Sequence, residues 1–487
     1  MTSDDITSIL AELGIRLEQQ EQRIQQQQQQ IQQQQQQIQS LSTENDRLKQ
    51  LLHDKGATKG SKAPQFSENY SVDKNTGKGR SKRGRQATGR RPQVDKLELV
   101  DDYVDIYEAG AKPSECIERR RQYVWRIIDG KANYVCYRLF AHPETQPLPS
   151  IAGVRNSLSE YGIEILLIVA FLHYWVGISL DNTCGVVQFF TGLALSKSQA
   201  NALLEQLSRD WQTQYDTIAT LLSRQMVLYI DETGWQVGSD SCYTWAFSTT
   251  MHVLFRCGVG RGKAEAQAIV GEYFAGIGVS DDYAVYQSLF SQHQLCWAHL
   301  LRKAIKLMLQ HPEHTEYKAF LDSLYRIYQQ AVRWQKDQRL RAGRVDKVNI
   351  LQARIRKLCA EAGTPIDKDK MPTHQQTFIR LQNELVNGVD ALFVFVTHPQ
   401  VEPTNNRSER NVRREAEVRK GGRTSKTNHG AERRGIIMTV LATLNTRFEV
   451  FTLETLLAEI ERWVETGISL FQAELTEFNH ANAPPAA

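Results

Sequence analysis

The sequence has no pair of cysteines in the C-x-x-C spacing that redox motifs and many zinc modules use, although it contains seven cysteines in 487 residues. An odd and scattered set of cysteines excludes a disulfide-stapled framework and is typical of a reducing cytoplasm. The chain begins with acids and glutamines rather than with a basic and then an apolar stretch, so we expect no secretory signal. These absences predict a cytoplasmic protein.

The sequence also has no uninterrupted apolar run of the length that crosses a membrane. The most apolar stretch, 163–180, is interrupted by Glu164, His173 and Gly177 and has no basic flank. We therefore expect a buried core helix there and no membrane partner. A hydrophobic content of 41% supports a sizeable core, and the length predicts several domains.

The N-terminal segment 1–53 is rich in glutamine and carries a heptad repeat, which predicts a coiled coil. Middle d positions are glutamines, which weakens the seam, and Asn45 is the candidate register-setting residue of a parallel dimer. A disordered polyglutamine tract is the alternative. The apolar residues of the repeat are Leu10, Leu17, Ile24, Ile31, Ile38 and Leu52, with Leu13, Leu41 and Leu48 three positions further on.

Segment 54–96 loses this periodicity and fills with Gly, Ser, Thr and basic residues, which is typical of a flexible linker. Arginines flanked by glycine can enter a minor groove and neutralise phosphates, so the segment is interpreted as a DNA-binding arm, with a merely solubilising linker as the alternative. The candidate DNA contacts are Lys78, Arg80, Lys82, Arg83, Arg85, Arg90 and Arg91.

Residues 97–225 are predicted to be mainly helical, with helices near 159–177 and 180–190 and a third opening at Ser196. The last two resemble a helix-turn-helix, and Ser196 to Gln199 has the capping-box pattern. Lys197 and Asn201 would lie on the exposed first turn, where recognition helices read bases. Many structural helices begin in the same way, so a purely structural helix is the alternative.

Two carboxylates follow apolar strand-like runs, Asp231 after 226–230 and Asp281 after 276–280. Because a hairpin and a helix are predicted between them, the two acids would lie on neighbouring strands. Paired carboxylates and substrate phosphates are the usual environment of Mg²⁺. Glu409 is the best third acid, on the early turns of a helix that begins near a P-T-N-N stretch. Several basic residues around it suit phosphate oxygens: Arg407, Arg410, Arg413, Arg414, Arg419, Lys420 and Arg423.

Four runs in order, DETGW at 231–235, SDDYAVY at 280–286, CWAHLLR at 296–302 and TNNRSER at 404–410, resemble the IS66-type bacterial DDE transposases over roughly 160–450. The resemblance implies a ribonuclease-H-like α/β core (mixed sheet with flanking helices) with an α-helical insertion, and Asp231, Asp281 and Glu409 as catalytic metal ligands for Mg²⁺, which Mn²⁺ can replace. It also implies DNA ends and target DNA as substrates, small accessory proteins as possible partners, and a location at the bacterial nucleoid.

The resulting domain prediction has six parts. They are a coiled coil (1–53) that makes a dimer or higher oligomer, the arm (54–96), the helical DNA-binding region (97–225), the catalytic domain (226–299 and 396–450), its helical insertion (300–395), and a C-terminal helix and tail (451–487).

The chain departs from the family pattern in two places. Asp282 stands where the family has glycine, which leaves Asp282 as a second candidate for the middle ligand beside the favoured Asp281. The usual cysteine-rich zinc module is absent, since only Cys116 and Cys136 occur in that region, so no zinc is expected. The C-x-x-H pair Cys296 and His299 offers only two ligands and is interpreted as a strand-to-helix transition near the active site.

The roles of Trp235 and His299 stay open at this point, and so do two other functions of the whole protein. Trp235 would stack on an unpaired base or simply pack, and His299 is either near the active site or a core residue. Glu232 should point away from Asp231 and is not counted as a ligand. Globally, a ribonuclease-H-like nuclease without strand transfer and a non-catalytic domesticated DNA-binding protein compete with transposition by metal-dependent cleavage and joining.

Overall fold

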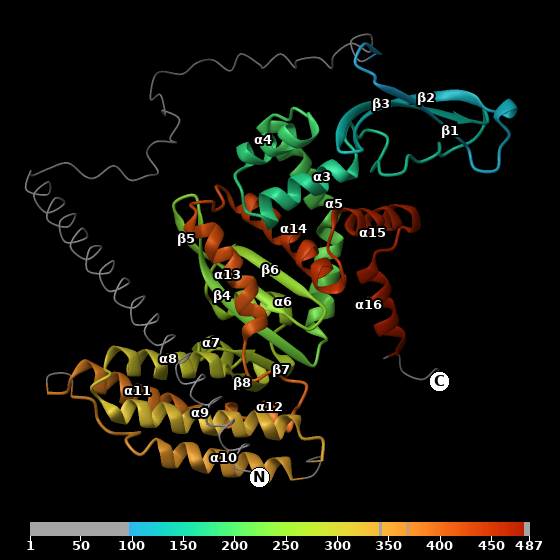
Figure 1. Cartoon of the computed structure of the whole chain (residues 1–487). Coiled ribbons are helices and arrows are strands. Elements are labelled where there is room, and N and C mark those ends of the chain that lie inside the picture. The colour runs from blue at the N-terminus through green and yellow to red at the C-terminus, as the bar shows by residue number, and fades with distance from the viewer. Residues whose placement is uncertain (1–96, 340–342, 368–369, 482–487) are drawn as a thin grey trace, which may run out of the picture. The chain divides into compact units, whose positions relative to one another are not determined.

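The computed structural model describes residues 97–339, 343–367 and 370–481 (Figure 1). The chain divides into two compact units, 1–89 and 90–487, and every described residue belongs to the second unit. The predicted coiled coil with Asn45 and the predicted basic arm therefore lie outside the described residues. The same holds for the candidate arm contacts Lys78, Arg80, Lys82, Arg83, Arg85, Arg90 and Arg91.

The described part opens with a small three-stranded sheet. Its strands are β1 (Asp102–Tyr107), β2 (Ile117–Ile128) and β3 (Lys131–Ala141), in the order β1-β3-β2, with a 3-10 turn η2 (Pro113–Glu115) before β2. Strands β2 and β3 form an antiparallel hairpin, whereas β1 runs parallel to β3. The hairpin turns at Asp129 and Gly130, which both have positive φ, 51° and 76°.

The prediction that residues 97–225 are mainly helical is wrong for their first third. Positive φ at two consecutive turn residues suits the twist of paired strands, and Asp-Gly is a favoured pair for it. An Asp-Gly pair between two runs rich in β-branched and aromatic residues was therefore the missed sequence signal. The sheet buries Val124, Val135 and Leu139 against Ile151 and Val154, so side-chain packing stabilises the hairpin.

Helices begin at residue 163, close to the predicted position. They are α3 (Ile163–Ala170), which continues into a π-helical turn η3 (Phe171–Trp175), then α4 (Leu180–Thr191) and α5 (Lys197–Ser223). Glu164, which interrupts the apolar run, is buried and accepts a bond from Arg126 of β2 at 2.8 Å. Within the described ranges no helix is both long and apolar enough to span a membrane.

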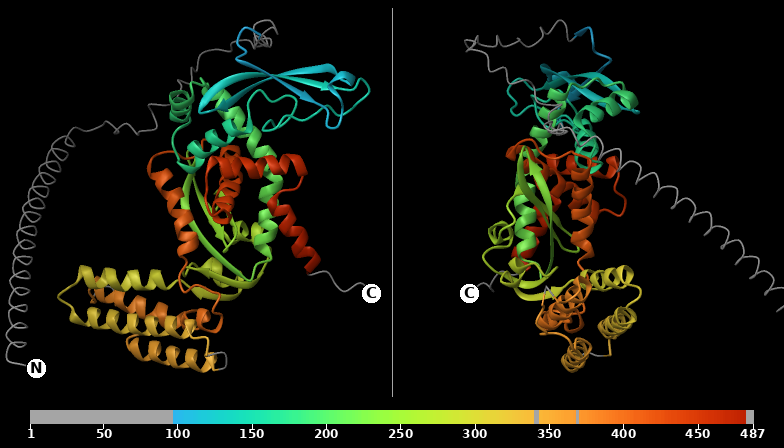
Figure 2. Two further views of the ribbon diagram at one scale, coloured as in Figure 1. Left: turned by 45° about the vertical axis from the view of Figure 1, so that its right-hand side comes forward. Right: turned by 90° about the vertical axis from the view of Figure 1, so that its left-hand side faces the viewer.

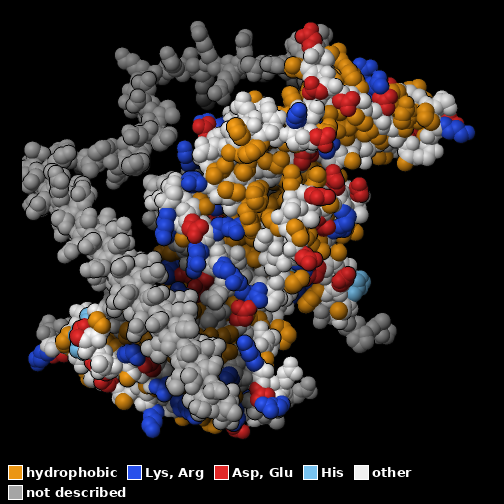
Figure 3. Space-filling view, viewed as in Figure 1, with side chains coloured by type: hydrophobic (Ala, Val, Ile, Leu, Met, Phe, Trp, Pro, Cys, Tyr) orange, Lys and Arg blue, Asp and Glu red, His pale blue; other side chains and the backbone are white. Residues whose placement is uncertain are grey.

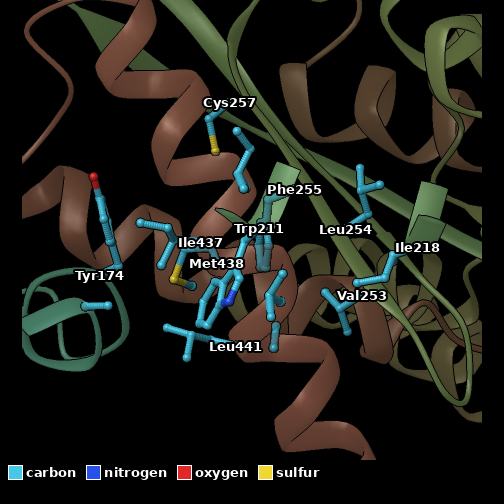
Figure 4. Packing of buried hydrophobic residues seen from close by; sticks show 14 of the residues in the cluster. Tyr174, Trp211, Ile218, Val253, Leu254, Phe255, Cys257, Ile437, Met438 and Leu441 are labelled. Carbon is cyan, nitrogen blue, oxygen red and sulfur yellow. The ribbon is translucent and has the colours of Figure 1, made fainter. Parts of the chain in front are cut away.

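Helix α5 begins with the predicted capping box, in which Ser196 accepts from the Gln199 amide at 3.2 Å and Gln199 accepts from the Ser196 amide at 2.9 Å. Its 27 residues then run through the protein core, where Trp211 and Ile218 are buried (Figure 4). Near the start of the helix, Lys197 and Asn201 are exposed to solvent. Base reading by this turn stays a prediction, and most of α5 is structural.

The central sheet has five strands in the order β6-β5-β4-β7-β8. They are β4 (Val227–Val237), β5 (Asp240–Ser248), β6 (Val253–Val259), β7 (Phe274–Ser280) and β8 (Phe290–Leu295), with α6 (Lys263–Val270) and α7 (Ala284–Gln287) in the connections. The first three strands are antiparallel, and β4, β7 and β8 are parallel. The expected strand, hairpin, helix and strand are confirmed.

Helices cover both faces of this sheet, so the fold is mixed α/β as predicted (Figure 2). One face is covered by α13 (Asn406–Lys420) and α14 (Asn428–Arg447), whose Ser408 and Thr439 bond to the backbones of β5 and β6. The other face packs against α5 and α6. Figure 4 shows Trp211 of α5, Phe255 of β6 and Met438 of α14 meeting in the main core.

Between β8 and α13 the chain forms the helical insertion, with the helical character predicted for 300–395. Its helices are α8 (Trp297–Gln310), α9 (Thr315–Lys336), α10 (Arg344–Leu358), α11 (Thr373–Asn387), the 3-10 turn η4 (Val389–Ala391) and α12 (Val394–Thr397). They pack around Leu324, Leu351 and Phe393, in a core that the insertion shares with strands β4, β7 and β8. The Trp297 amide donates to the Pro403 carbonyl at 3.1 Å, so the insertion begins and ends at one place.

Two helices, α15 (Leu453–Thr466) and α16 (Leu470–Ala481), occupy the region where a single C-terminal helix was expected. Gly467 ends α15 in the left-handed conformation with φ 70°, which the sequence prediction overlooked. Phe471 of α16 then packs on Trp463 of α15, with ring centroids 5.7 Å apart. Helix α16 turns away from α15 and packs against α5 (Figure 1).

Candidate functional site

The two candidate aspartates are brought together by strand register. Strand β4 pairs in parallel with β7 so that Val227 faces Ile277 and Tyr229 faces Val279. The same offset of fifty places Asp231 beside Asp281, two residues beyond the last paired residues, Tyr229 and Val279. The predicted strand end at Asp231 is wrong, because β4 continues to Val237 through its pairing with β5. Asp281 does follow the end of β7 directly, as predicted.

Glu409 is delivered to the same place by the first turn of α13. Asn405, the N-cap residue, donates from its buried side chain to the Ile230 carbonyl at 2.7 Å. Buried Ser408 bonds to the carbonyls of Tyr229 and Ala246 at 2.9 Å each. These bonds fix the start of the helix against the segment of β4 that carries Asp231. Glu409 is therefore held beside the two aspartates.

The three acids interact electrostatically. Burial, followed by the negative charges of Glu232, Asp281 and Glu409, raises the pKa of Asp231 to about 8. The Glu232 amide, which donates to Asp231 at 3.0 Å, acts in the opposite direction. Such crowding of carboxylates is relieved by a bound divalent cation, so the three acids suit a divalent metal ion.

The raised pKa of Asp231 predicts that the metal-free protein becomes less stable as pH rises. Because the pKa of Asp231 is about 8 in the folded chain and 3.8 without the shift, the folded state binds the extra proton between these values. The free energy of unfolding of the metal-free protein should therefore decline through this window by up to about 1.4 kcal/mol per pH unit. Asp231→Asn should remove this decline, and denaturant unfolding in chelator at pH 5 and pH 8 measures it.

The matched control for that measurement is Asp240→Asn, because Asp240 is an exposed aspartate at the start of β5. Its pH dependence should equal that of the wild type. Equal slopes for the wild type and Asp231→Asn would contradict the raised pKa of Asp231.

Glu409 has three further neighbours, all from the CWAHLLR run. Arg302 of α8 donates to its two oxygens at 2.8 and 2.7 Å. The Cys296 thiol donates to Oε1 at 3.5 Å, and His299 Nδ1 lies 3.4 Å from the same oxygen. Burial raises the pKa of Cys296 to about 11, so this thiol is protonated in the metal-free chain. His299 is thus next to the acidic cluster, as the favoured interpretation held.

The structure decides the remaining alternative for Trp235. Trp235 is 2% exposed and donates to Ser425 Oγ at 3.2 Å, so it packs and cannot stack on a base. Glu232 binds Arg261 at 2.8 Å and the Tyr286 hydroxyl. Its exclusion as a metal ligand stays a prediction. Asp282 is exposed beside Asp281, and the choice between them stays a prediction.

The basic residues of α13 divide into two groups. Arg410, Arg413 and Lys420 are exposed, whereas Arg407 pairs with Glu402 at 2.7 Å and Arg414 stacks 3.5 Å from the centre of the Trp175 ring. Figure 3 shows lysine and arginine side chains gathered over this part of the surface. The exposed group is placed to contact phosphates, while Arg407 and Arg414 also have structural partners.

A pocket of about 350 Å³ opens beside the aspartates. Its wall includes Asp281, Asp282, Cys296, His299 and Lys303. Lys303 also lines a second pocket of about 710 Å³ between α8 and α11, together with Lys306 and Arg380. Lys303 pairs with Glu384 at 2.5 Å, and Glu384 also lines both pockets, so within the described part of the chain Lys306 and Arg380 supply the unpaired positive charge of the second one.

Sequence reasoning missed the residues that hold Glu409. Arg302 belongs to the CWAHLLR run, and Asn405 and Ser408 belong to the TNNRSER run, but no function was predicted for these three residues. Polar residues spaced three apart before an acid were the available signal, but their partners are strand carbonyls that no spacing reveals. The interpretation that Cys296 and His299 offer only two metal ligands also changes, because Glu409 supplies a third nearby atom.

Two comparisons with known proteins bear on this site. The family model described as Transposase IS66 family matches residues 159–433, which include all three acids and the helical insertion. No curated protein matches the chain.

Proposed function

The chain belongs to the IS66 family of transposases, and from that membership we propose that it cleaves transposon ends and joins them to target DNA by a DDE mechanism. Membership itself implies transposition and DNA as the partner. The proposal adds that Asp231, Asp281 and Glu409 hold two divalent metal ions. When bound, such ions activate the attacking oxygen and stabilise the leaving one in an in-line displacement.

The observation that carries the proposal is the convergence of three acids from distant parts of the chain. Strand register aligns Asp231 with Asp281, and buried bonds of Asn405 and Ser408 bring Glu409 to them. A five-stranded sheet with acids on its two adjacent parallel strands supports the ribonuclease-H-like assignment.

The residues around the acids suit a DNA substrate. Arg410, Arg413 and Lys420 would neutralise phosphates, and Lys303 and Lys306 would guide the strand into the pocket beside Asp281. Arg302, which holds both oxygens of Glu409, keeps this acid oriented until metal and DNA bind. We also propose that the arm and the coiled coil add DNA affinity and dimerisation.

A nuclease that cuts without joining is the second candidate, because the same three acids would serve hydrolysis alone. The discriminating experiment incubates the full-length protein with a labelled duplex carrying the element's own end and a supercoiled plasmid in Mg²⁺. We expect both cleaved and joined products. Cleavage with no joining would favour the nuclease, and DNA binding without chemistry would favour a non-catalytic protein.

A further inference from the structure

Three ligand atoms of different chemistry converge beside the acidic cluster. The sulfur of Cys296, a ring nitrogen of His299 and a carboxylate oxygen of Glu409 all lie within 4.8 Å of one another. We propose that these residues form a second metal site, which binds a zinc-like transition-metal ion and not Mg²⁺.

Two of the three spacings match tetrahedral coordination, and the third, between Cys296 and His299, is within 4.8 Å. Zinc binds sulfur at about 2.3 Å and nitrogen or oxygen at about 2.0–2.1 Å, so tetrahedral neighbours lie roughly 3.3–3.6 Å apart. The sulfur of Cys296 is 3.5 Å and Nδ1 of His299 is 3.4 Å from the same oxygen, Oε1 of Glu409. Such an ion therefore fits with only small side-chain movements.

The donor set selects the kind of metal. Thiolate and imidazole favour zinc and the later first-row metals, whereas Mg²⁺ requires a shell of oxygens. An ion at this site would replace the thiol proton of Cys296, which passes to solvent on binding. The site therefore differs from the all-carboxylate site proposed for catalysis, although both use Glu409.

Two features of the metal-free chain point to an incomplete site. Nδ1 of His299 is buried and has no hydrogen-bond partner, which is a costly state that a metal ion would relieve. The sulfur of Cys296 accepts a bond from the Asn405 amide at 3.1 Å, a donor that would stabilise a thiolate. Both residues belong to the C-x-x-H run, to which the proposed transposition chemistry gives no role.

The proposed metal site is accessible, and its three protein ligands leave the fourth coordination position of the ion open. Cys296 and His299 line the pocket of about 350 Å³ beside Asp281, which provides an entry path. Three protein ligands with an open position are typical of exchangeable rather than purely structural zinc. Arg302 can retain the second oxygen of Glu409, at 2.7 Å, while Oε1 binds the ion.

One expected effect of the second metal site concerns strand transfer, and it rests on the proposed function. Zinc and Mg²⁺ would compete for Glu409, so excess zinc should inhibit strand transfer and additional Mg²⁺ should restore it. The site itself is tested without any activity measurement, so its failure and the failure of the proposed function are distinguishable.

The test titrates the chelator-treated, full-length protein with Co²⁺ as the probe. We expect a single saturable site with thiolate-to-cobalt charge-transfer absorption that Zn²⁺ abolishes by displacement. Cys296→Ser should lose this absorption, and His299→Gln should weaken binding by more than about 100-fold, because even outer-shell partners are worth about 10- to 100-fold. Cys359→Ser, which alters another buried free cysteine, should behave as the wild type.

A measurement on the unaltered protein covers the case in which Cys296→Ser misfolds. X-ray absorption of the zinc-loaded wild type should show one sulfur at about 2.3 Å together with nitrogen or oxygen neighbours. Absence of sulfur from the zinc shell, absence of Co²⁺ binding, or unchanged charge-transfer absorption in folded Cys296→Ser would each overturn the proposal.

Discussion

Asp231→Asn, Asp281→Asn and Glu409→Gln should each lower strand transfer by about a thousandfold or more, while DNA binding is retained. A bound metal supplies several kcal/mol of charge stabilisation in the transition state, and each 1.4 kcal/mol corresponds to about a tenfold change in rate. Binding should persist because it depends on the basic residues rather than on the acids. Joined and cleaved products are quantified separately, and binding is measured by mobility shift.

The matched control is Asp282→Asn, which alters the exposed neighbour of Asp281. We expect near wild-type strand transfer from this variant. If Asp282→Asn is inactive and Asp281→Asn is active, the middle ligand is Asp282. Full activity in Glu409→Gln would contradict the assignment of the third acid. Unfolding is not an alternative explanation for Asp231→Asn, because this change should stabilise the metal-free protein at neutral pH.

Breaking the buried ion pair between Arg434 and Glu415 should cause the largest loss of stability. The two side chains are 5% and 0% exposed, and they share bonds of 2.7 and 2.9 Å that join α14 to α13. Removing one partner leaves a buried charge unpaired, which costs about 3–5 kcal/mol. Arg434→Met and Glu415→Leu should each show this loss in denaturant unfolding.

A double-mutant cycle separates the pair from simple packing. The combination of Arg434→Met and Glu415→Leu should be much closer to the wild type than either single change, because no charge is left unpaired. Lys197→Met is the control for an exposed pair, since Lys197 and its partner Asp181 are 66% and 70% exposed, and its effect should be below about 1 kcal/mol. Additive losses in the double variant would refute strong coupling between Arg434 and Glu415.

Much of the central fold could be predicted from local patterns. Strands β4 to β7 coincide with short apolar runs, whereas β8 has the polar sequence FSQHQL and was not predicted. The capping box at Ser196 marks the start of α5. The candidate acids follow from the same patterns, since Asp231 and Asp281 each come after an apolar run. What could not be predicted is the continuation of β4 beyond Asp231, because pairing with β5 is a tertiary effect that overrides a local strand end.

Local sequence patterns did not predict the small N-terminal sheet or the residues around Glu409, and the two failures have different causes. The Asp129-Gly130 turn is a local signal, but residues 97–225 were assigned from the helical pattern that follows it. Contacts of Glu409 with Cys296 and Arg302 join residues more than a hundred positions apart, and no periodicity encodes such a distance. Local rules thus located the reacting groups but not the groups that hold them.

The single hydrogen bond between Trp297 and Pro403 has an evolutionary consequence. Because the insertion leaves the sheet and returns to it at one point, a module of different length can stand there without displacing the ends of β8 and α13. Its core is shared with β4, β7 and β8, so any replacement must cover Tyr229, Ile277 and Val279 with apolar side chains. Related chains could lengthen or replace the outer helices of this module under that condition while the acids on the sheet and on α13 keep their places.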